Sequence, residues 1–170
     1  MTKLIVEKIY PDAILPKRAN LTDSGLDITF HNLKKVYRHV GGNGETLINN
    51  DADLKKQISY NMLELQYLER ALIGTGIRVI TEDGYDIQIR PRSEQALNQG
   101  LTLCNAIDTI DPNFRDELCV ILINLSRKRQ TIILGDKIAQ LFVTPVTLCD
   151  VLEGKLDNND RGGGFGSGGI

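Results

Sequence analysis

Short runs of strand-forming residues recur from one end of the chain to the other, and this rhythm constrains the fold more than any other feature. The runs are separated by turn residues, mainly Gly, Pro, Asn and Asp. Regular short strands with turn residues between them are typical of an all-β sandwich or barrel. The expected strands are Leu4–Ile9, Leu26–Phe30, Ala71–Ile80, Tyr85–Arg90, Leu101–Cys104, Leu118–Leu125, Thr131–Leu134 and Ile138–Val146.

The run Leu118–Leu125 differs from the other expected strands. Its sequence, LCVILINL, is apolar at both alternating positions. Successive side chains of a strand point to opposite faces, so this pattern predicts a strand that is buried on both sides. One of those sides is free to pack against another subunit, which favours an oligomer.

Residues 31–70 interrupt the rhythm. GGNGE (41–45) and NNDAD (49–53) predict loops, and the glycines do not form a phosphate loop because Gly-Lys-Ser/Thr is absent. After the possible caps Asp51 and Asp53, apolar residues recur in steps of three and four, which favours a short helix. Those apolar positions are Leu54, Ile58, Met62, Leu65 and Leu68.

The size and charge of the chain exclude several classes of protein. Its 170 residues suit a single domain with its own core. A net charge of −2 gives no electrostatic footprint for polymeric nucleic acid. No apolar run reaches the length of a membrane span, and the N-terminus lacks the character of a signal peptide, so we expect a cytoplasmic protein, or one of the host cytoplasm if the source is viral.

The cysteines and histidines indicate no protein-built metal site. Cys104, Cys119 and Cys149 are odd in number and lie in apolar runs, which favours buried free thiols over a disulfide. The two histidines, His31 and His39, have no acidic or cysteine partner at ligand spacing.

The stretch from Gly100 to Leu118, GLTLCNAIDTIDPNFRDEL, concentrates polar groups between two apolar runs. This pattern predicts a hairpin whose tip carries polar side chains. Such a tip can present an amide, a carboxylate and backbone groups at fixed separations to a small planar ligand. A polar β-turn without a function remains an alternative, because loops are polar in general.

A second polar cluster follows the strand that ends near Arg90. Ser93 suits the N-cap of a helical turn over Glu94–Asn98 that Gly100 would end. The free N–H groups at such a helix start, together with Arg92, favour an anion. The alternative is an ordinary capped helix with a solvated arginine.

The C-terminus reads as a flexible linker by composition, since six of the last ten residues are glycine. On composition alone, this segment needs no function.

Five segments together resemble the five ordered motifs of the trimeric dUTP diphosphatase (dUTPase) family. They are SGLDI (24–28), RPRSEQAL (90–97), the Gly100–Leu118 stretch, GDKIAQL (135–141) and RGGGFGSGG (161–169). The resemblance implies a jelly-roll-like β-barrel or sandwich that forms a homotrimer with exchange of C-terminal arms. It also implies hydrolysis of dUTP to dUMP and pyrophosphate by attack of water on the α-phosphorus, which limits uracil in DNA and supplies dUMP for dTMP synthesis.

The resemblance assigns roles to residues of the Gly100–Leu118 stretch. Asp111 is the expected catalytic residue, which activates water and bonds the sugar 3′-OH. The base is expected to pair with Asn105 and with backbone groups of Thr109, Ile110 and Asp111, an arrangement that rejects cytosine by leaving buried groups unpaired. Phe114 stands where the family generally has tyrosine against the sugar.

The resemblance assigns the phosphates to other motifs. Asp27 is expected to fix the Arg92 guanidinium, and Glu94, where glycine is usual, is expected to point its side chain away and offer only its N–H. Mg²⁺ is implied as a cofactor that substrate phosphates and water hold, without a direct protein ligand. Phe165 is expected to stack on uracil. The implied phosphate-binding residues are Arg92, Ser93, Glu94, Gln140, Arg161, Gly166 and Ser167.

The resemblance also divides the chain. It implies a β domain over 1–160, with an insertion at about 32–68 that we expect at the periphery because relatives cross this region in fewer residues, and a mobile glycine-rich lid over 161–170. The alternatives are an enzyme of the same fold that resembles dCTP deaminase, and a non-catalytic protein. The non-catalytic protein would be switched by nucleotide binding and would bind a regulatory protein through the 31–70 insertion. The chain departs from the family at Asp108 and Asp116, where glycine is common, and at Lys137, where arginine is usual.

Overall fold

Strands dominate the structure, a computed structural model that describes residues 2–40 and 44–157. The all-β prediction is therefore confirmed. The two helices of the described residues are short: α1 (Asp51–Gln57) and α2 (Ser93–Asn98). The strands are β1 (Leu4–Lys8), β2 (Leu26–Thr29), β3 (Asn32–Val40), β4 (Gly44–Ile48), β5 (Ile58–Ser59), β6 (Met62–Leu65), β7 (Arg70–Gly74), β8 (Ile77–Thr81), β9 (Tyr85–Arg90), β10 (Leu101–Leu103), β11 (Asp108–Ile110), β12 (Cys119–Asn124), β13 (Gln130–Ile133) and β14 (Lys137–Pro145).

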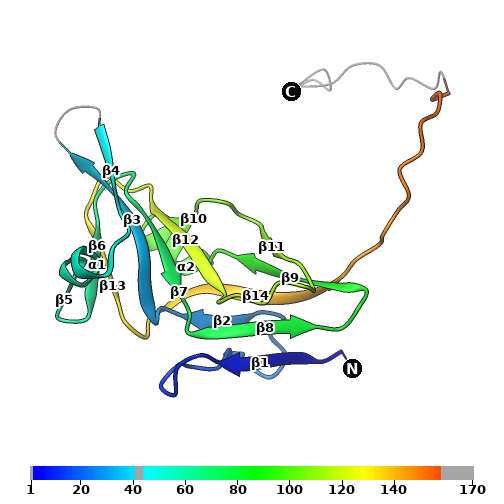
Figure 1. The fold of residues 1–170 in the computed structure, drawn as a ribbon, viewed down its shortest axis with the longest axis horizontal. Coiled ribbons are helices and arrows are strands. Elements are labelled where there is room, and N and C mark those ends of the chain that lie inside the picture. The colour runs from blue at the N-terminus through cyan, green and yellow to red at the C-terminus, as the bar shows by residue number, and fades with distance from the viewer. Residues whose placement is uncertain (1, 41–43, 158–170) are drawn as a thin grey trace.

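Two larger sheets supply most of the core (Figure 1). One has the strand order β10-β12-β7-β3-β4 and the other the order β11-β9-β14-β2. Alternate residues of their strands are buried in one hydrophobic cluster, as expected for strands with one face on a core. Smaller sheets, β1-β8 and β13-β6-β5, complete the body. Buried members of the cluster include Ile28, Val36, Ile73, Ile87, Ile89, Val120, Leu122 and Leu141.

The run Ala71–Ile80, expected as one strand, is two strands. β7 belongs to the five-stranded sheet, whereas β8 pairs with β1. The chain changes sheets at Gly76, whose φ of +75° suits glycine, and a Cβ there would collide with Ala13 and His31.

The Gly100–Leu118 stretch is not a hairpin, which corrects the prediction. β10 pairs with β12 over Leu101–Leu103, and β11 pairs with β9 over Asp108–Ile110. The two arms thus belong to different sheets. The physical reason is burial, because Leu101, Leu103 and Ile110 each turn into the core from their own sheet.

The placement of residues 32–68 at the periphery is wrong for two of its strands. β3 pairs with β7 from Asn32 to Tyr37, in the interior of the five-stranded sheet. Val36 of β3 is fully buried, as are Leu63 and Leu65 of β6. The segment therefore contributes to the core.

The predicted helix in this region exists but is shorter than its apolar spacing indicated. The Asn50 side chain caps α1 by accepting a hydrogen bond from the Asp53 N–H at 3.0 Å. Beyond Gln57 the chain becomes extended and forms β5 and β6, so Met62 and Leu65 lie on a strand. Ladder pairing of β6 with β13 replaces the helical bonds.

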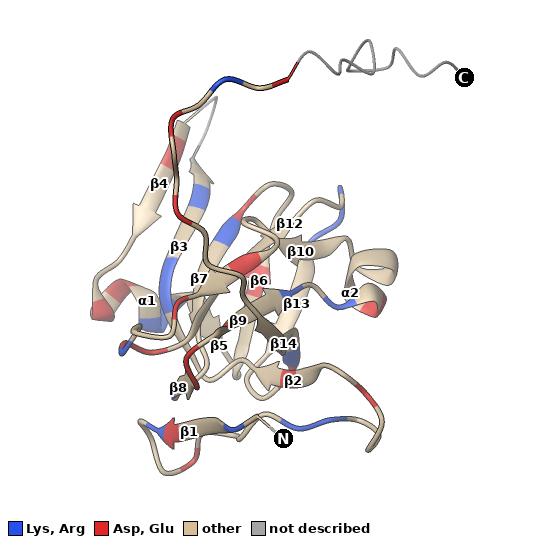
Figure 2. Ribbon diagram, turned by 90° about the vertical axis from the view of Figure 1, so that its right-hand side faces the viewer, with Lys and Arg blue, Asp and Glu red and all other residues tan. Residues whose placement is uncertain are grey.

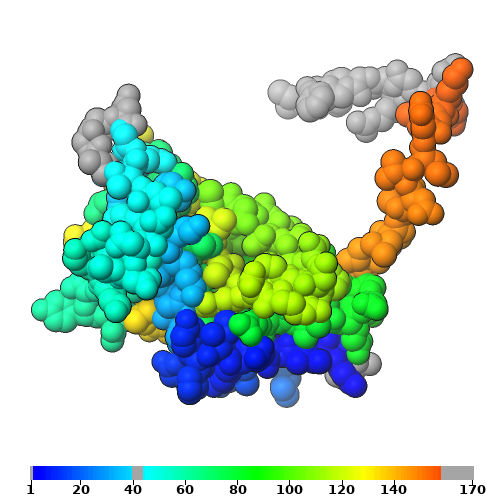
Figure 3. All heavy atoms as spheres, in the orientation of Figure 1, coloured from blue at the N-terminus to red at the C-terminus, as the bar shows by residue number. Residues whose placement is uncertain are grey.

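After β14 the chain runs away from the body as an extended segment (Figures 1 and 3). Its apolar side chains are exposed, among them Leu148, Val151, Leu152 and Leu156. The predicted lid residues Arg161, Phe165, Gly166 and Ser167 lie outside the described residues. In the described ranges, no helix combines the length and the apolar character needed to cross a membrane.

The three cysteines are free thiols, as predicted, but they are not all buried. Cys104 and Cys149 are exposed, and Cys119 is half-buried. Burial, with the charge of Glu117 nearby, raises the pKa of the Cys119 thiol to about 11.

Candidate active site

The four-stranded sheet brings three of the predicted motifs into one row. Gln140 of β14 lies opposite Asp27 on β2 and opposite Arg90 on β9. Arg92 follows two residues after β9 and reaches back to the start of β14, where its Nη1 donates to the Lys137 carbonyl at 3.1 Å. Residues that are far apart in the sequence therefore meet because antiparallel neighbours fix their register.

Asp27 is the centre of this row. Its side chain is buried, with 6% exposure, and three cationic or amide groups surround it. The Lys137 Nζ lies 2.7 Å from Oδ2, the Gln140 Nε2 donates to Oδ1 at 3.2 Å, and the Arg92 Nε lies 3.5 Å from Oδ1. The expected contact between Asp27 and Arg92 is present (Figure 2 shows the acidic segment of β2 beside basic residues near β14).

The partners of Asp27 lower its pKa by more than its burial raises it. Burial raises the pKa of this carboxyl, but hydrogen bonds from Lys137 and Gln140 and the charge of Arg92 bring the pKa below its ordinary value. Asp27 is therefore an anion throughout the neutral range. Lys137 makes the shortest of these contacts, and we did not predict this contact from the sequence. The only signal for it in the sequence is the position of Lys137 at the start of a strand, three residues before Gln140.

A polar pocket of about 460 Å³ opens beside Arg92, between α2 and the turn before β14. Arg92 itself occupies the N-cap position of α2 and Ser93 is the first helical residue, without a side-chain cap bond, so the prediction of Ser93 as N-cap is wrong. Glu94 lines the pocket as well, and its Oε2 lies 3.7 Å from the Arg92 Nη2. The lining residues are Arg92, Glu94, Gln95, Asn98, Gln99, Gly135, Asp136 and Lys137.

Asp111 directly follows β11, and its side chain is exposed. The preceding residue, Ile110, is buried, which anchors the strand end against the core. The Phe114 N–H donates to the Asp111 carbonyl at 3.0 Å and forms a tight turn. Within residues 2–40 and 44–157, no side-chain hydrogen bond or ion pair holds the Asp111 carboxyl group, whereas the turn fixes its backbone.

Of the residues expected to bind the base, Thr109 and Ile110 directly precede Asp111, and Asn105 lies in the turn before β11. Asn105 and Thr109 are exposed, and the Asn105 side chain also hydrogen bonds to Asp108. Asp108 is an addition to the predicted set: burial raises the pKa of its carboxyl, and hydrogen bonds from Asn105 and the Thr109 backbone offset that rise only in part.

Asp111 and Arg92 of one chain do not meet. Ile110 pairs with Ile87, so Asp111 lies next to the Asp86 end of β9, whereas Arg92 lies beyond the Arg90 end. Arg92 is six residues beyond Asp86, a span of about 20 Å for an extended chain. An arginine side chain does not bridge that distance, so the predicted site of one chain falls into two separate half-sites: one around Asp111 and one around Asp27 and Arg92.

Comparisons with known proteins agree on one family. The family model described as dUTPase matches residues 50–169. A deoxyuridine 5'-triphosphate nucleotidohydrolase of Hydrogenobaculum sp. is 38% identical over 99% of both chains. Another protein of that name, from Solibacter usitatus, is 46% identical over 96% of this chain and 94% of its own length.

Solved structures show the same fold. The dUTPase of Staphylococcus bacteriophage 80alpha, in a structure with dUpNHpp, matches with a TM-score of 0.70, 18% identity and 99% of each chain covered. A dUTPase from phage phi11 of S. aureus, in a structure concerned with the coordination of a structural Mg(II) ion, matches with a TM-score of 0.68, 18% identity, and 92% and 99% coverage. The predicted jelly-roll-like architecture is confirmed by these likenesses.

Proposed function

The chain belongs to the dUTPase family and hydrolyses dUTP, and we propose that it does so at sites which two copies of the chain build from their separate half-sites. The reaction gives dUMP and pyrophosphate, which keeps uracil out of DNA and supplies dUMP for dTMP synthesis. The observation that carries the proposal is the separation of Asp111 from Arg92 within one chain. The cytoplasm stays our prediction for where the reaction takes place.

In this proposal, the Asp111 half-site holds the nucleoside. The Asn105 side chain and the backbone of Thr109, Ile110 and Asp111 form the edge that pairs with uracil. Cytosine leaves groups of that edge unpaired, which disfavours its binding strongly. The Phe114 ring is half-buried and contacts the hydrophobic core, which fixes a flat face for the deoxyribose. Phe165 covers the base from the C-terminal segment.

Asp111 performs the chemical step with water. Its exposed carboxylate accepts a hydrogen bond from a water molecule and orients it for attack on the α-phosphorus. The bond from that phosphorus to the oxygen that bridges the α- and β-phosphates breaks, and pyrophosphate leaves. The sugar 3′-OH bonds to the same carboxylate, which sets the distance between Asp111 and the α-phosphorus.

The Asp27 and Arg92 half-site of a second copy holds the phosphates. Arg92 is kept in place by Asp27 and offers its remaining N–H groups, and Gln140 has a second amide hydrogen beyond the one it gives to Asp27. The N–H groups of Ser93 and Glu94 contribute from the backbone. Positive charge placed along the phosphates stabilises the charge that develops as the bond breaks. Arg161, Gly166 and Ser167 complete the shell from the C-terminal lid over 161–170.

We also propose Mg²⁺ as the cofactor. The described residues bring no three His, Cys, Asp or Glu side chains together as a metal site, whereas phosphate oxygens and water are ligands that Mg²⁺ prefers. The ion would therefore bind with the substrate, without a direct protein ligand. When bound, it neutralises negative charge on the phosphates.

The shared site requires an oligomer, which we propose to be a homotrimer. Cys119, Ile121 and Ile123 form a half-exposed apolar face on β12, the strand whose sequence is apolar on both sides. An apolar face of this kind suits contact with another copy. The exposed apolar segment after β14 extends away from its own body and suits exchange of the C-terminal arm between copies. Binding of a regulatory protein to residues 31–70 stays a prediction.

Replacement of Asp111 tests the catalytic assignment. Asp111→Asn keeps the size and loses the negative charge, so we expect pyrophosphate release from dUTP to fall by about 1,000-fold, with binding of a non-hydrolysable dUTP analogue retained. Pyrophosphate release and analogue binding measure the two effects, and ammonia release from dCTP serves as a control for deaminase chemistry. An Asn variant as fast as the wild type would refute the role of Asp111.

A further inference from the structure

Glu117 ends the segment that starts at Asp111, and its carboxylate contacts three residues, two on β3 and one between β7 and β8. Only 11% of its side chain is exposed. The Lys34 Nζ lies 2.5 Å from its Oε2, the Asn32 Nδ2 donates to its Oε1 at 3.0 Å, and the Gly76 N–H donates to Oε1 at 2.8 Å. A charged group with this many partners is held in one position.

The neighbouring strand leaves room for this carboxylate. Gly74 of β7 lies against it, and a Cβ at Gly74 would collide with the Glu117 carboxylate and the Asn32 side chain. The φ of Gly74 is not positive, so glycine is required here for space and not for backbone conformation.

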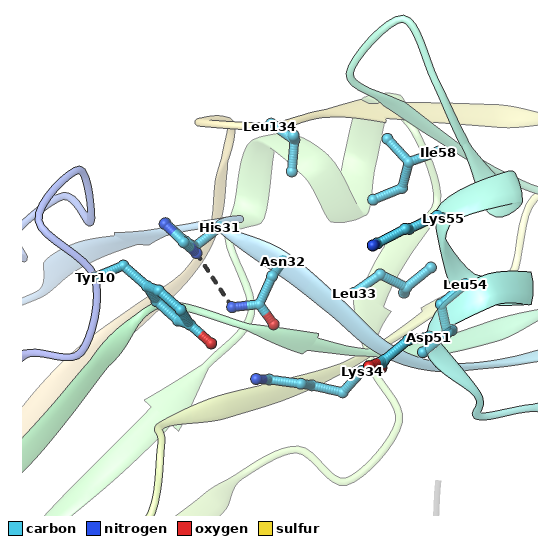
Figure 4. A pocket seen from close by; sticks show the side chains of 10 residues that line it. All are labelled: Tyr10, His31, Asn32, Leu33, Lys34, Asp51, Leu54, Lys55, Ile58 and Leu134. Atoms are coloured by element: carbon cyan, nitrogen blue, oxygen red, sulfur yellow. Dashed lines mark hydrogen bonds between the residues drawn. The ribbon is translucent and has the colours of Figure 1, made fainter.

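A bulge in β3 aims Lys34 at Glu117. The register of β3 against β7 shifts between Leu33 and Lys35, which leaves Lys34 as the extra residue. Bulges of this kind redirect a side chain and are common beside active sites. Figure 4 shows Asn32 and Lys34 projecting to the same side of β3, next to His31, whose Nδ1 lies 3.1 Å from the Asn32 Nδ2.

The interactions keep Glu117 charged. Burial raises the pKa of its carboxyl, but hydrogen bonds from Lys34, Gly76 and Asn32 lower it below the ordinary value, and Glu117 in turn raises the pKa of Lys34. The ion pair is therefore intact at neutral pH.

The contacts of Glu117 fix the far end of the Asp111 segment. β11 pairing fixes the near end at Ile110, and the backbone of Leu118 is bonded next to Glu117, since its N–H donates to the Ile77 carbonyl at 2.8 Å. In the described part of the chain, Glu117 alone among the charged side chains of 111–117 contacts another element; Arg115 bonds only to carbonyls of Pro112 and Phe114.

We propose that Glu117, held by Lys34 and Asn32, is a positioning residue. It fixes the end of the segment that starts at Asp111 and thereby sets the position of Asp111 relative to the α-phosphorus. The proposal rests on the catalytic role of Asp111 given above. None of the three residues contacts the substrate in this account. Lys34 and Asn32 come from β3, which lies outside the five motifs.

Lys34→Met tests the proposal. It leaves Glu117 without its cation and frees the end of the segment, so we expect kcat for dUTP to fall by about 10- to 100-fold, because a displacement of about 1 Å can cost that much. The KM should stay within about threefold, because the base edge and the phosphate half-site are untouched. Lys34→Arg should restore most of kcat. Lys56→Met, which removes an exposed lysine paired with Asp53, is the matched control and should leave kcat unchanged.

A double variant separates positioning from general damage. If Lys34 acts through Glu117, Lys34→Met with Glu117→Gln should lower kcat little more than either change alone. Should Lys34→Met fail to fold, Asn32→Leu removes one hydrogen bond and should still lower kcat more than KM rises. Wild-type kcat retained in Lys34→Met or in Asn32→Leu overturns the inference, whereas an inactive wild type would overturn the function itself.

Discussion

At the scale of single residues, Asp27 shows how one buried carboxylate organises a cationic site. Lys137, Gln140 and Arg92 all converge on it. Without this anion, the two cations would repel each other, and the Arg92 guanidinium would lose the contact that orients it. In the proposed function, the carboxylate therefore serves the phosphates indirectly, by presenting positive groups to them.

Asp27→Asn should therefore lower stability and weaken substrate binding together. We expect a loss of about 1–3 kcal/mol in the free energy of unfolding at pH 7 and an increase in KM for dUTP of about tenfold. Because the folded-state pKa of Asp27 lies below its ordinary value of 3.8, its charge stabilises the fold above that pH, and this contribution is lost as the pH falls through the folded-state pKa.

Urea unfolding of both proteins at several pH values measures the effect. The stability difference between wild type and Asp27→Asn should be full at pH 7 and should shrink below the ordinary pKa of 3.8. Glu7→Gln, which removes an exposed partner of Arg78, is the control and should change stability by less than about 1 kcal/mol. A difference that stays constant down to acid pH would mean that the Asp27 charge does not stabilise the fold.

The residues also show which parts of the site the sequence could predict. The contact of Asp27 with Arg92 followed from motif resemblance and simple charge pairing. The contacts of Lys137 and Glu117 did not, because they depend on strand register and on a bulge, and a pattern of single residues carries neither. The exposure of Cys104 was missed for the same reason: the apolar run around it ends at a turn between two sheets.

At the scale of elements, the positions of strands were predictable and their partners were not. Short apolar runs bounded by turn residues located β9, β12 and β14 to within a residue or two. Pairing depends on distant segments, so the sequence did not show that β10 and β11 belong to different sheets. The apolar spacing of residues 54–68 is compatible with either a helix or a strand, because each run is short. Pairing with β13 makes the later part a strand, β6.

Gly74→Ala tests how closely β7 and the catalytic segment approach each other. The added methyl group meets the Glu117 carboxylate and Asn32, so we expect a loss of about 1–3 kcal/mol in stability and a lower kcat. Thermal unfolding and dUTP hydrolysis measure the two effects. Gly154→Ala, where a Cβ meets no atom within 4 Å, is the control. Equal stability and equal kcat in the two variants would show that the close approach of Gly74 to Glu117 and Asn32 affects neither quantity.

At the scale of the whole molecule, we propose that each chain supplies one half of two different active sites. In this proposal, the four-stranded sheet carries the nucleoside half-site at one end of β9 and the phosphate half-site at the other. The apolar face of β12 and the exposed segment after β14 offer contacts for neighbouring copies. A ring of copies satisfies this arrangement if each copy completes one active site with each of its two neighbours. Closed cyclic symmetry is the usual way for proteins to build such a ring.

The most direct measurement of this account is complementation between two inactive variants. Asp111→Asn and Arg92→Ala each disable one half-site, so each protein alone should hydrolyse dUTP at a small fraction of the wild-type rate. When the two are unfolded together, mixed in equal amounts and refolded, random assembly should restore about one quarter of the sites, since those sites combine an intact Asp111 with an intact Arg92 from different copies. Recovery of pyrophosphate release near that level is the predicted result. A mixture no more active than its parts, although it assembles as the wild type does, would contradict the shared site.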